Sequence, residues 1–399
     1  MSLSNGNNAF ASGPQTAQSR PMPLELLDDK KKLQSLKQFL HQFSAPAAEA
    51  LIERKENGDI QCFSCGHRCL VKPGRDGVCR VRFNEGGVLQ VPYGYVGPLA
   101  CDPIEKKPFW HVLPGSDALT FGMLGCDYHC GYCQNWVTSQ MLRDPDAVAQ
   151  PKRCTPQQLV DIAIQHRAPV VASSYNEPLI TSEWAVDVFK VAKARGLRCA
   201  YISNGNGTPQ VLDFIRPYVD AYKVDLKTFS DKNYRQLGGV LEHVTDTIKM
   251  LKERGFWVEI VTLVVPSFSD DADDLKRMAE FIASVDPLMP WHMTAFHPDY
   301  KMTDGYRRTT TDDLMKVVEY GKQAGLKYMY PGNLPGQVGE WENTRCHHCN
   351  ATLIRRFSFM VQENRMTSGD GLCPDCHKPI PGIWGKPSGH GDGRVRHIA

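Results

Sequence analysis

The sequence predicts an α/β fold: a partial, open (β/α)6-type barrel, preceded by an N-terminal Cys-rich module and followed by a C-terminal zinc-ribbon-like module. Two observations support this prediction. Between about residues 117 and 330, short apolar segments alternate with segments of helical period, which is typical of a parallel sheet covered by helices. Most of the 14 cysteines are gathered in short groups at two- or three-residue spacing, before, inside and after this region.

The chain divides into four segments by composition. Residues 1–30 are rich in Ser, Asn, Gly, Pro and Gln, and we expect a disordered N-terminal tail. Residues 31–110 form the helical and Cys-rich module, where apolar residues at helical spacing predict that residues 30–55 are helical. Residues 111–335 form the core, and residues 336–399 carry two Cys-x-x-Cys pairs and a flexible, Gly-rich end.

The core elements follow in order. Strands are predicted at residues 119–124, 169–173, 198–203, 220–226, 257–264, 291–296 and 326–330. Helices begin at Thr155-Pro156 and Thr208-Pro209, where Thr is the N-cap and Pro the first helical residue, and further helices cover 181–195, 240–254, 270–284 and 311–324. Such βα units are too few for a closed eight-stranded barrel, and their chemistry is expected beyond the carboxyl ends of the strands.

Composition excludes several classes of protein. The formal net charge of +2 gives no global field for nucleic acid or an anionic membrane. No apolar run reaches the roughly 18 residues of a membrane span, and no apolar signal region follows Met1. Closely spaced cysteines suit metal binding better than disulfides, so we expect a reduced, cytoplasmic metalloprotein.

The cysteine triad, Cys126, Cys130 and Cys133, follows the first predicted core strand in a C-x3-C-x2-C frame. Three thiolates can bind three irons of a 4Fe–4S cluster and leave the fourth iron open, as a catalytic site requires. The alternative is a zinc site in which His129 is the fourth ligand.

This frame resembles the signature of the radical S-adenosylmethionine (SAM) superfamily. The resemblance implies that SAM chelates the open iron through its amino and carboxylate groups. It also implies that an electron from the cluster releases a 5′-deoxyadenosyl radical, which abstracts hydrogen from a substrate. Tyr132 matches the aromatic position that packs on adenine in that superfamily.

Further matches follow successive strands. Glu177, in Ser173-Ser-Tyr-Asn-Glu177-Pro178, resembles the segment that binds the SAM amino group, although the usual glycines are replaced. Ser203 and Asn204 resemble the segment that contacts the ribose and carboxylate. Asp225 and Lys227 resemble the Asp-Leu-Lys of pyruvate formate-lyase activating enzymes, which helps to hold SAM.

A wider resemblance covers nearly all of residues 60–385. It extends to the AmmeMemoRadiSam-system radical SAM enzymes, relatives of those activating enzymes, and implies Memo-like and AMMECR-domain partners and an electron donor such as flavodoxin or ferredoxin. The segments that carry it are Cys62-Phe-Ser-Cys65-Gly-His-Arg-Cys69, Gly77-Val78-Cys79, Asp102-Pro-Ile-Glu-Lys-Lys-Pro108, Trp291-His292 and Phe296-His297-Pro298.

Two further groups of cysteines flank the core. The N-terminal cysteine group is Cys62, Cys65, Cys69 and Cys79, and it can hold zinc or iron–sulfur, with His67 as a substitute ligand, or consist of buried free thiols. The C-terminal cysteine group is Cys346, Cys349, Cys373 and Cys376. Its spacing resembles a zinc ribbon, and an auxiliary iron–sulfur cluster is the alternative.

The functional prediction is therefore a radical SAM enzyme with an unknown substrate. One alternative is an activating enzyme for a glycyl-radical enzyme, and a non-catalytic multi-zinc scaffold is the alternative from another class. His292 and His297, which are expected around the carboxyl end of the strand at 291–296, and Glu105 are further candidates near the site, and for each a structural role is at least equally plausible.

Overall fold

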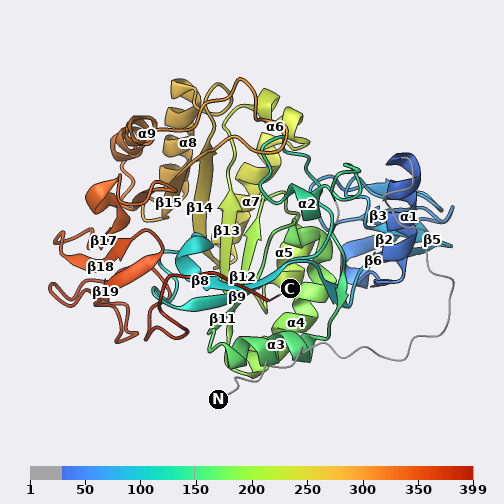
Figure 1. Cartoon of the computed structure of the whole chain (residues 1–399), viewed down its shortest axis with the longest axis horizontal. Coiled ribbons are helices and arrows are strands. Elements are labelled where there is room, and N and C mark those ends of the chain that lie inside the picture. The colour runs from blue at the N-terminus through green and yellow to red at the C-terminus, as the bar shows by residue number, and fades with distance from the viewer. Residues whose placement is uncertain (1–28, 148, 399) are drawn as a thin grey trace, which may run out of the picture.

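The computed structural model of the chain describes residues 29–147 and 149–398 (Figure 1). The predicted tail at residues 1–30 lies outside the described residues, except for the two residues that begin the first helix.

The centre of the molecule is a nine-stranded sheet in the order β16-β15-β14-β13-β12-β11-β9-β8-β20. Within this sheet, the seven strands β9 and β11 to β16 are parallel to one another, which confirms the predicted α/β architecture, whereas β8 is antiparallel to β9. The parallel strands are β9 (Asp117–Phe121), β11 (Val170–Ser173), β12 (Arg198–Ser203), β13 (Ala221–Asp225), β14 (Trp257–Val264), β15 (Trp291–Ala295) and β16 (Met329–Gly332).

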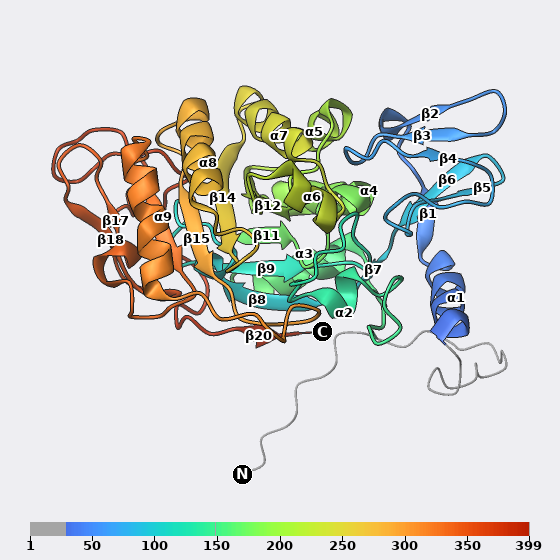
Figure 2. The ribbon, with the colours of Figure 1, turned by 90° about the horizontal axis from the view of Figure 1, so that it is seen from above.

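Helices connect these strands and pack outside the sheet, as α7, α8 and α9 show in Figure 2. Thr155 caps α3 with a capping box, and Thr208 caps α5, as the two Thr-Pro pairs predict. The helices are α2 (Trp136–Ser139), α3 (Pro156–Gln165), α4 (Ser182–Ala194), α5 (Pro209–Ile215), α6 (Asp231–Leu237), α7 (Leu241–Glu253), α8 (Ala272–Val285) and α9 (Thr311–Gln323), with 3-10 turns η3 (Ile104–Lys106), η4 (Pro178–Thr181) and η5 (Gly339–Glu342).

The N-terminal module is mostly β structure. α1 (Asp29–His41) ends well before residue 55, so the helix expected within 30–55 is shorter than its full range. Pro46 lacks the N–H that a helix needs, and β1 (Ser44–Pro46) pairs with β6 instead. The remaining elements are η2 (Glu49–Leu51), β2 (Ile52–Arg54), β3 (Ile60–Cys62), β4 (Leu70–Val71), β5 (Phe83–Glu85), β6 (Val88–Pro92), and β7 (Tyr95–Val96), which pairs with β10 (Lys152–Arg153).

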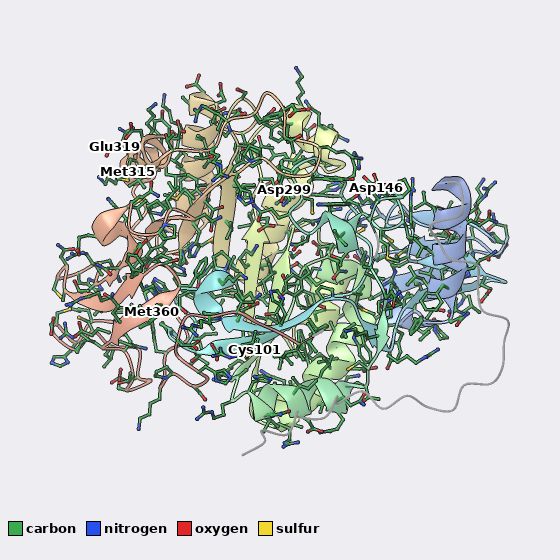
Figure 3. All side chains as sticks on the ribbon, in the orientation of Figure 1. Cys101, Asp146, Asp299, Met315, Glu319 and Met360 are labelled. Carbon is green, nitrogen blue, oxygen red and sulfur yellow. The ribbon has the colours of Figure 1, made fainter. Side chains whose placement is uncertain are left out.

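The C-terminal module is a three-stranded antiparallel sheet of β17 (Thr344–Arg345), β18 (Thr352–Phe357) and β19 (Met360–Asn364). The segment after it crosses the sheet and ends as β20 (Arg396–His397), which pairs with β8 (Leu99–Pro103). Figure 3 labels Cys101 on β8 and Met360 on β19. The end of the chain was expected to be flexible, but the structure places it. Arg396 and His397 are held there because they pair with β8.

Small side chains line the inside of the barrel at its amino end. Ala118, Ala172, Ala200 and Ala221 pack with Phe109 and Val112 in one apolar group. We call residues 109–113 the floor segment, because it fills this end of the barrel. Among the described residues, no helix is long and apolar enough to cross a bilayer.

Candidate cofactor site at the carboxyl ends of the strands

The cysteine triad lies on the loop that follows β9 and lines a cavity at the carboxyl ends of the strands. Cys130 is buried, and Cys126 and Cys133 are partly buried. Burial raises the pKa of the Cys130 thiol to about 12, so this thiol is protonated at neutral pH until a metal displaces the proton. Among the described residues that line the cavity, there is no fourth cysteine and no histidine.

The loop is held by groups from several elements. Arg143 donates a hydrogen bond of 2.7 Å to the Cys126 carbonyl, and Gln140 donates one of 3.1 Å to the Tyr128 carbonyl. The His129 amide donates to the Leu237 carbonyl at the end of α6. Gly125 has φ +89°, and a Cβ there would come within 2.7 Å of Val81 in the N-terminal module. The thiols are therefore positioned by the barrel and by the module that precedes it.

Asp127 is the buried centre of a polar network behind the triad. Its carboxylate accepts hydrogen bonds from the side-chain amides of Asn204, at 2.7 Å, and Asn206, at 2.9 Å. The Asn206 carbonyl in turn accepts the Gly66 amide at 2.8 Å. Asp127 therefore links the cysteine loop, the end of β12 and the N-terminal cysteine group. Sequence reasoning missed Asp127, because it stands at an unspecified (x) position of the C-x3-C-x2-C frame.

Glu177 lies at the carboxyl end of β11, at the start of η4, and lines the same cavity. Its carboxyl group accepts hydrogen bonds from the Ser203 hydroxyl and from the backbone N–H of Asn204, each at 2.7 Å. Burial, with the nearby charge of Asp127, raises the pKa of Glu177 to about 8. A cation bound beside it would favour the ionised form.

The end of β13 supplies a charged row. Asp225 forms ion pairs with Lys223 and with Lys227, whose Nζ lies 3.2 Å from Asp225 Oδ2, and all three line the cavity. Burial opposes the charged form of Lys227, but Asp225, and after it Cys130 and Tyr132, raise its pKa well above the ordinary value. Lys223 was not predicted, although its alternation with Asp225 on one strand places both side chains on the inner face.

Tyr132 and His129 are not among the residues that line this cavity, although the Lys227 amine lies 6.0 Å from the centre of the Tyr132 ring. Tyr132 is buried, its ring packs edge-on against Phe268 at 5.9 Å, and its hydroxyl has no hydrogen-bond partner among the described residues. His129 is exposed and does not line the cavity, which disfavours it as a fourth ligand of a zinc site.

Tyr175 contributes a group that sequence reasoning did not find. Its φ is +67°, which is strained for a residue with a large side chain, and it lines the cavity. The Tyr175 hydroxyl donates to Asp102 at 3.1 Å and lies 3.2 Å from Lys107 Nζ. The Asp102–Lys107 pair therefore lies directly behind Tyr175.

His292 was expected around the carboxyl end of its strand, and that position is wrong. It is the second residue of β15, near the amino end, and its Nε2 lies 2.7 Å from Glu259. Burial lowers the pKa of His292. Glu105 is also buried, at the floor segment, whereas His297 is exposed beside Gln134. The histidine and the glutamate are structural groups of the barrel interior.

The two flanking cysteine groups differ in geometry. In the C-terminal group, the four sulfurs lie within 4.8 Å of one another, and no other such set of metal-binding side chains is found in residues 29–147 and 149–398. The N-terminal group is gathered but more open. The Cys62 amide donates to the Cys69 carbonyl, and the Cys69 sulfur accepts the Val78 amide at 3.4 Å. Thiolates on different irons of one cluster are farther apart than thiolates on one ion. The triad and the N-terminal group can therefore hold a cluster although their sulfurs do not all lie within 4.8 Å of one another.

The fold and the site together define an α/β barrel protein with a three-cysteine loop at the barrel mouth. The model of the radical SAM superfamily matches residues 121–282. The chain is similar to an uncharacterised protein of Methanocaldococcus jannaschii, with 35% identity over 330 residues, which are 82% of this chain and 97% of the relative. The chain therefore belongs to the radical SAM superfamily, whose members are enzymes that use a 4Fe–4S cluster and SAM.

Two further similarities concern activating enzymes. Pyruvate formate-lyase 1-activating enzyme of Escherichia coli is 28% identical over 237 residues, which are 54% of this chain and 93% of that enzyme. A solved domain of the pyruvate-formate lyase-activating enzyme of Bacteroides vulgatus is 19% identical, with a TM-score of 0.36, and the match covers 41% of this chain and 98% of that domain. Membership in a family of enzymes argues against the non-catalytic multi-zinc scaffold.

Proposed function

We propose that this enzyme reductively cleaves SAM at a 4Fe–4S cluster held by Cys126, Cys130 and Cys133. The bound cluster and SAM would supply a 5′-deoxyadenosyl radical that abstracts hydrogen from a substrate held in the barrel. The observation that carries this proposal is the cavity itself. Three thiols line it, without a fourth cysteine or histidine among its described lining residues, so one iron is left for SAM.

The residues around the triad suit a zwitterionic ligand. Glu177 is a buried carboxyl group that can pair with the SAM amino group, and the Ser203 hydroxyl and Asn204 amide orient it. Lys227 can pair with the SAM carboxylate, while Asp225 holds Lys227 in place. For Tyr132, contact with adenine would require the ring to leave its present packing or the backbone to make the contact.

The substrate is proposed to be a small molecule or peptide, handled with Memo-like and AMMECR-like partner proteins. The match to the Escherichia coli activating enzyme covers only 54% of the chain, whereas the match to the uncharacterised archaeal relative covers 82%. The archaeal relative matches more of this chain than the activating enzyme does. This supports a role that long chains of this kind have in common and that differs from the role of the shorter activating enzymes.

Activation of a glycyl-radical enzyme is the second candidate. The observation that favours it is the 28% identity to a pyruvate formate-lyase activating enzyme over 93% of that enzyme's length. A glycyl radical signal on a partner protein after treatment with SAM would support this candidate over the first.

The remaining assignments complete the proposal. The N-terminal cysteine group is proposed to hold a second metal, zinc or an iron–sulfur cluster, because its four thiols lie together beside the Asp127 network.

A flavodoxin or ferredoxin would supply the electron. A cytoplasmic location agrees with 14 cysteines that are free thiols in the structure.

The test is anaerobic purification of the full chain, with counts of iron, sulfide and zinc, followed by dithionite and SAM. We expect brown protein and release of 5′-deoxyadenosine and methionine, with omission of dithionite as the control. Colourless protein with zinc at the triad, or no cleavage of SAM by iron-loaded protein, would overturn the proposal.

A further inference from the structure

The four sulfurs of the C-terminal cysteine group converge as the ligands of a single ion. Cys346 Sγ lies 3.7 Å from Cys376 Sγ, and Cys349 Sγ lies 3.8 Å from Cys373 Sγ. A tetrahedral ion with bonds of about 2.3 Å to sulfur has sulfur–sulfur edges of about 3.8 Å. A disulfide would require about 2.05 Å, and a 4Fe–4S cluster would spread the thiolates over separate irons. The geometry therefore matches one ion with four thiolates.

The backbone repeats one ligand-bearing turn twice. Each pair of cysteines is followed by a residue in the left-handed region, Asn350 at φ 62° and His377 at φ 55°. The Asn350 amide donates to the Cys346 carbonyl, and the His377 amide donates to the Cys373 carbonyl, both at 2.9 Å. Two matching turns from separate parts of the chain thus face each other across the four sulfurs.

Nearby histidines are used in other ways. His347 Nδ1 lies 2.7 Å from the Tyr328 hydroxyl, which makes His347 a contact between the ribbon and the barrel. The His348 amide points at the Cys346 sulfur at 3.4 Å. Four thiolates without an open position are typical of a structural site.

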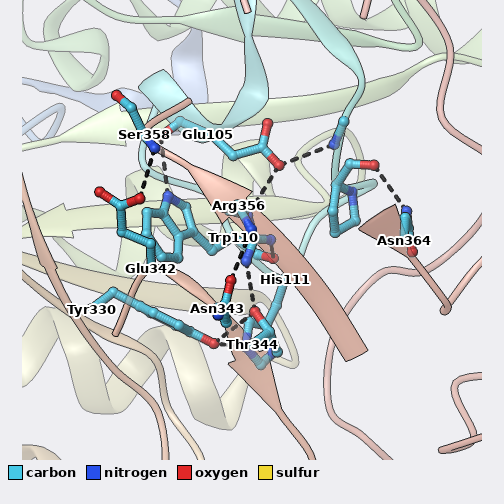
Figure 4. A network of polar contacts seen from close by, with 12 residues as sticks. Glu105, Trp110, His111, Tyr330, Glu342, Asn343, Thr344, Arg356, Ser358 and Asn364 are labelled. Carbon is cyan, nitrogen blue, oxygen red and sulfur yellow. Dashed lines mark hydrogen bonds and ion pairs between the residues drawn. The ribbon is translucent and has the colours of Figure 1, made fainter. Parts of the chain in front are cut away.

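The C-terminal module has one small apolar cluster, which it shares with Trp110, Tyr328 and Tyr330 of the barrel region, and it also makes buried polar contacts with the barrel (Figure 4). Arg356 on β18 is buried, and its guanidinium donates to the Trp110 carbonyl at 2.7 Å and to Thr344 at 2.8 Å. It also lies 4.6 Å from the centre of the Trp110 ring and forms an ion pair with Glu105. A small module of this kind needs an additional stabilising element, and a bound metal commonly supplies it.

The chain that leaves the second cysteine pair runs directly to the floor segment. The Ile383 amide donates to the His111 carbonyl at 2.7 Å, and the Leu113 amide donates to the Ile383 carbonyl at 2.7 Å. The Trp110 and His111 amides donate to Glu259, which holds His292 inside the barrel. A constraint on the cysteine group is thus transmitted to the floor segment by continuous contacts.

We propose that Cys346, Cys349, Cys373 and Cys376 bind one tetrahedral divalent cation of the zinc class, and that this ion fixes the ribbon and residues 377–398 on the barrel. The site is independent of the triad and of the radical chemistry. It is structural, so the reaction does not pass through it.

The test uses the full-length protein purified without oxygen. Elemental analysis should give at least one zinc per chain in addition to iron, and zinc K-edge absorption should show four sulfur ligands at about 2.3 Å. Cys349 is the exposed member of the group, so Cys349→Ser is the variant least harmful to packing. We expect the variant to lose one zinc per chain relative to the wild type, with unchanged iron. Cys154→Ser, which changes a buried cysteine outside the three groups, is the control and should keep its zinc.

Hydrogen exchange supplies the second readout. In Cys349→Ser, amides of residues 380–398 and of the floor segment should exchange at least tenfold faster, while those of β12 and β13 stay unchanged. Zinc retained at full level in Cys349→Ser, or iron and sulfide lost instead of zinc, would overturn the assignment. If the variant does not fold, the zinc K-edge spectrum of the wild-type protein decides: four sulfur ligands support the site, and a mixture of sulfur with oxygen or nitrogen ligands contradicts it.

Discussion

The side-chain amide of Asn204 donates a hydrogen bond of 2.7 Å to Asp127, and so connects the end of β12 to the loop that carries the cysteine triad. Asn206 donates to the other carboxylate oxygen at 2.9 Å. Asp127 is fully buried. A buried carboxylate that accepts two amides holds the loop in one position, because any shift would leave its charge without partners.

Asp127→Asn should lower both thermal stability and iron content. The new amide would face the Asn206 amide, donor against donor, at a cost of about 1.5–3 kcal/mol for a lost bond to a charged group. The double variant Asp127→Asn/Asn206→Asp reverses the polarity of the pair and should recover most of the iron and of the melting temperature. Asn206→Asp alone places two carboxylates together and should be worse than either. If the double variant recovers nothing, the pair is not what holds the loop.

Cys130→Ala should abolish release of 5′-deoxyadenosine and remove the iron of one 4Fe–4S cluster, because two thiols cannot hold the cubane at this loop. Zinc content should stay at the wild-type level. Cys154→Ala is the matched control, since Cys154 is buried but belongs to none of the three groups. Product formation that survives in Cys130→Ala would place the chemistry elsewhere.

Glu177→Gln should weaken SAM binding while leaving iron content unchanged. A charge-assisted contact is worth about 1.5–3 kcal/mol, which corresponds to about a 10- to 100-fold rise in Kd. Anaerobic calorimetry with iron-loaded protein measures it. Glu253→Gln, at an exposed position at the end of α7, is the control and should bind as the wild type does. An unchanged Kd in Glu177→Gln would show that the SAM amine lies away from Glu177.

The protein should lose stability as the pH falls from about 6.5 towards 4, and His111 should account for part of the loss. Burial lowers the pKa of His111 to about 4, although the nearby charge of Glu259 acts to raise it. Between these pH values the unfolded chain binds a proton that the folded chain excludes, so stability falls by up to about 3 kcal/mol. Melting temperatures from pH 7.5 to pH 5 measure the slope.

His111→Gln is the informative variant for this pH dependence. It should melt lower at pH 7.5, because the ring contacts with Tyr330 and the Pro381 carbonyl, both at 2.7 Å, are changed. Its melting temperature should nevertheless fall less steeply with pH than that of the wild type. His397→Gln, at an exposed position, should keep the wild-type slope. Equal slopes in all three proteins would remove His111 from the explanation.

Local patterns predicted much of the core. The strands at 198–203 and 257–264 have the same bounds in the structure, and the Thr155 and Thr208 caps lie where they were expected. These features depend on neighbouring residues, and so a single sequence carries them. β8 and β20 were missed because they lie outside the βα alternation, and β8 is held as a strand by antiparallel pairing with β9 and with β20. The helix within 30–55 was overextended because apolar spacing at 33–43 does not show where strand pairing begins.

Within the candidate site, the sequence predicted the cysteine triad, because ligands a few residues apart can converge on one metal centre. It also predicted the polar residues after each strand, because the carboxyl ends of parallel strands lie at the same edge of the sheet. The sequence did not predict the central role of Asp127, the strained backbone of Tyr175 or the position of His292 inside the barrel. Those depend on which side chains the packing of distant segments brings into contact and shields from water, and only the folded chain settles that.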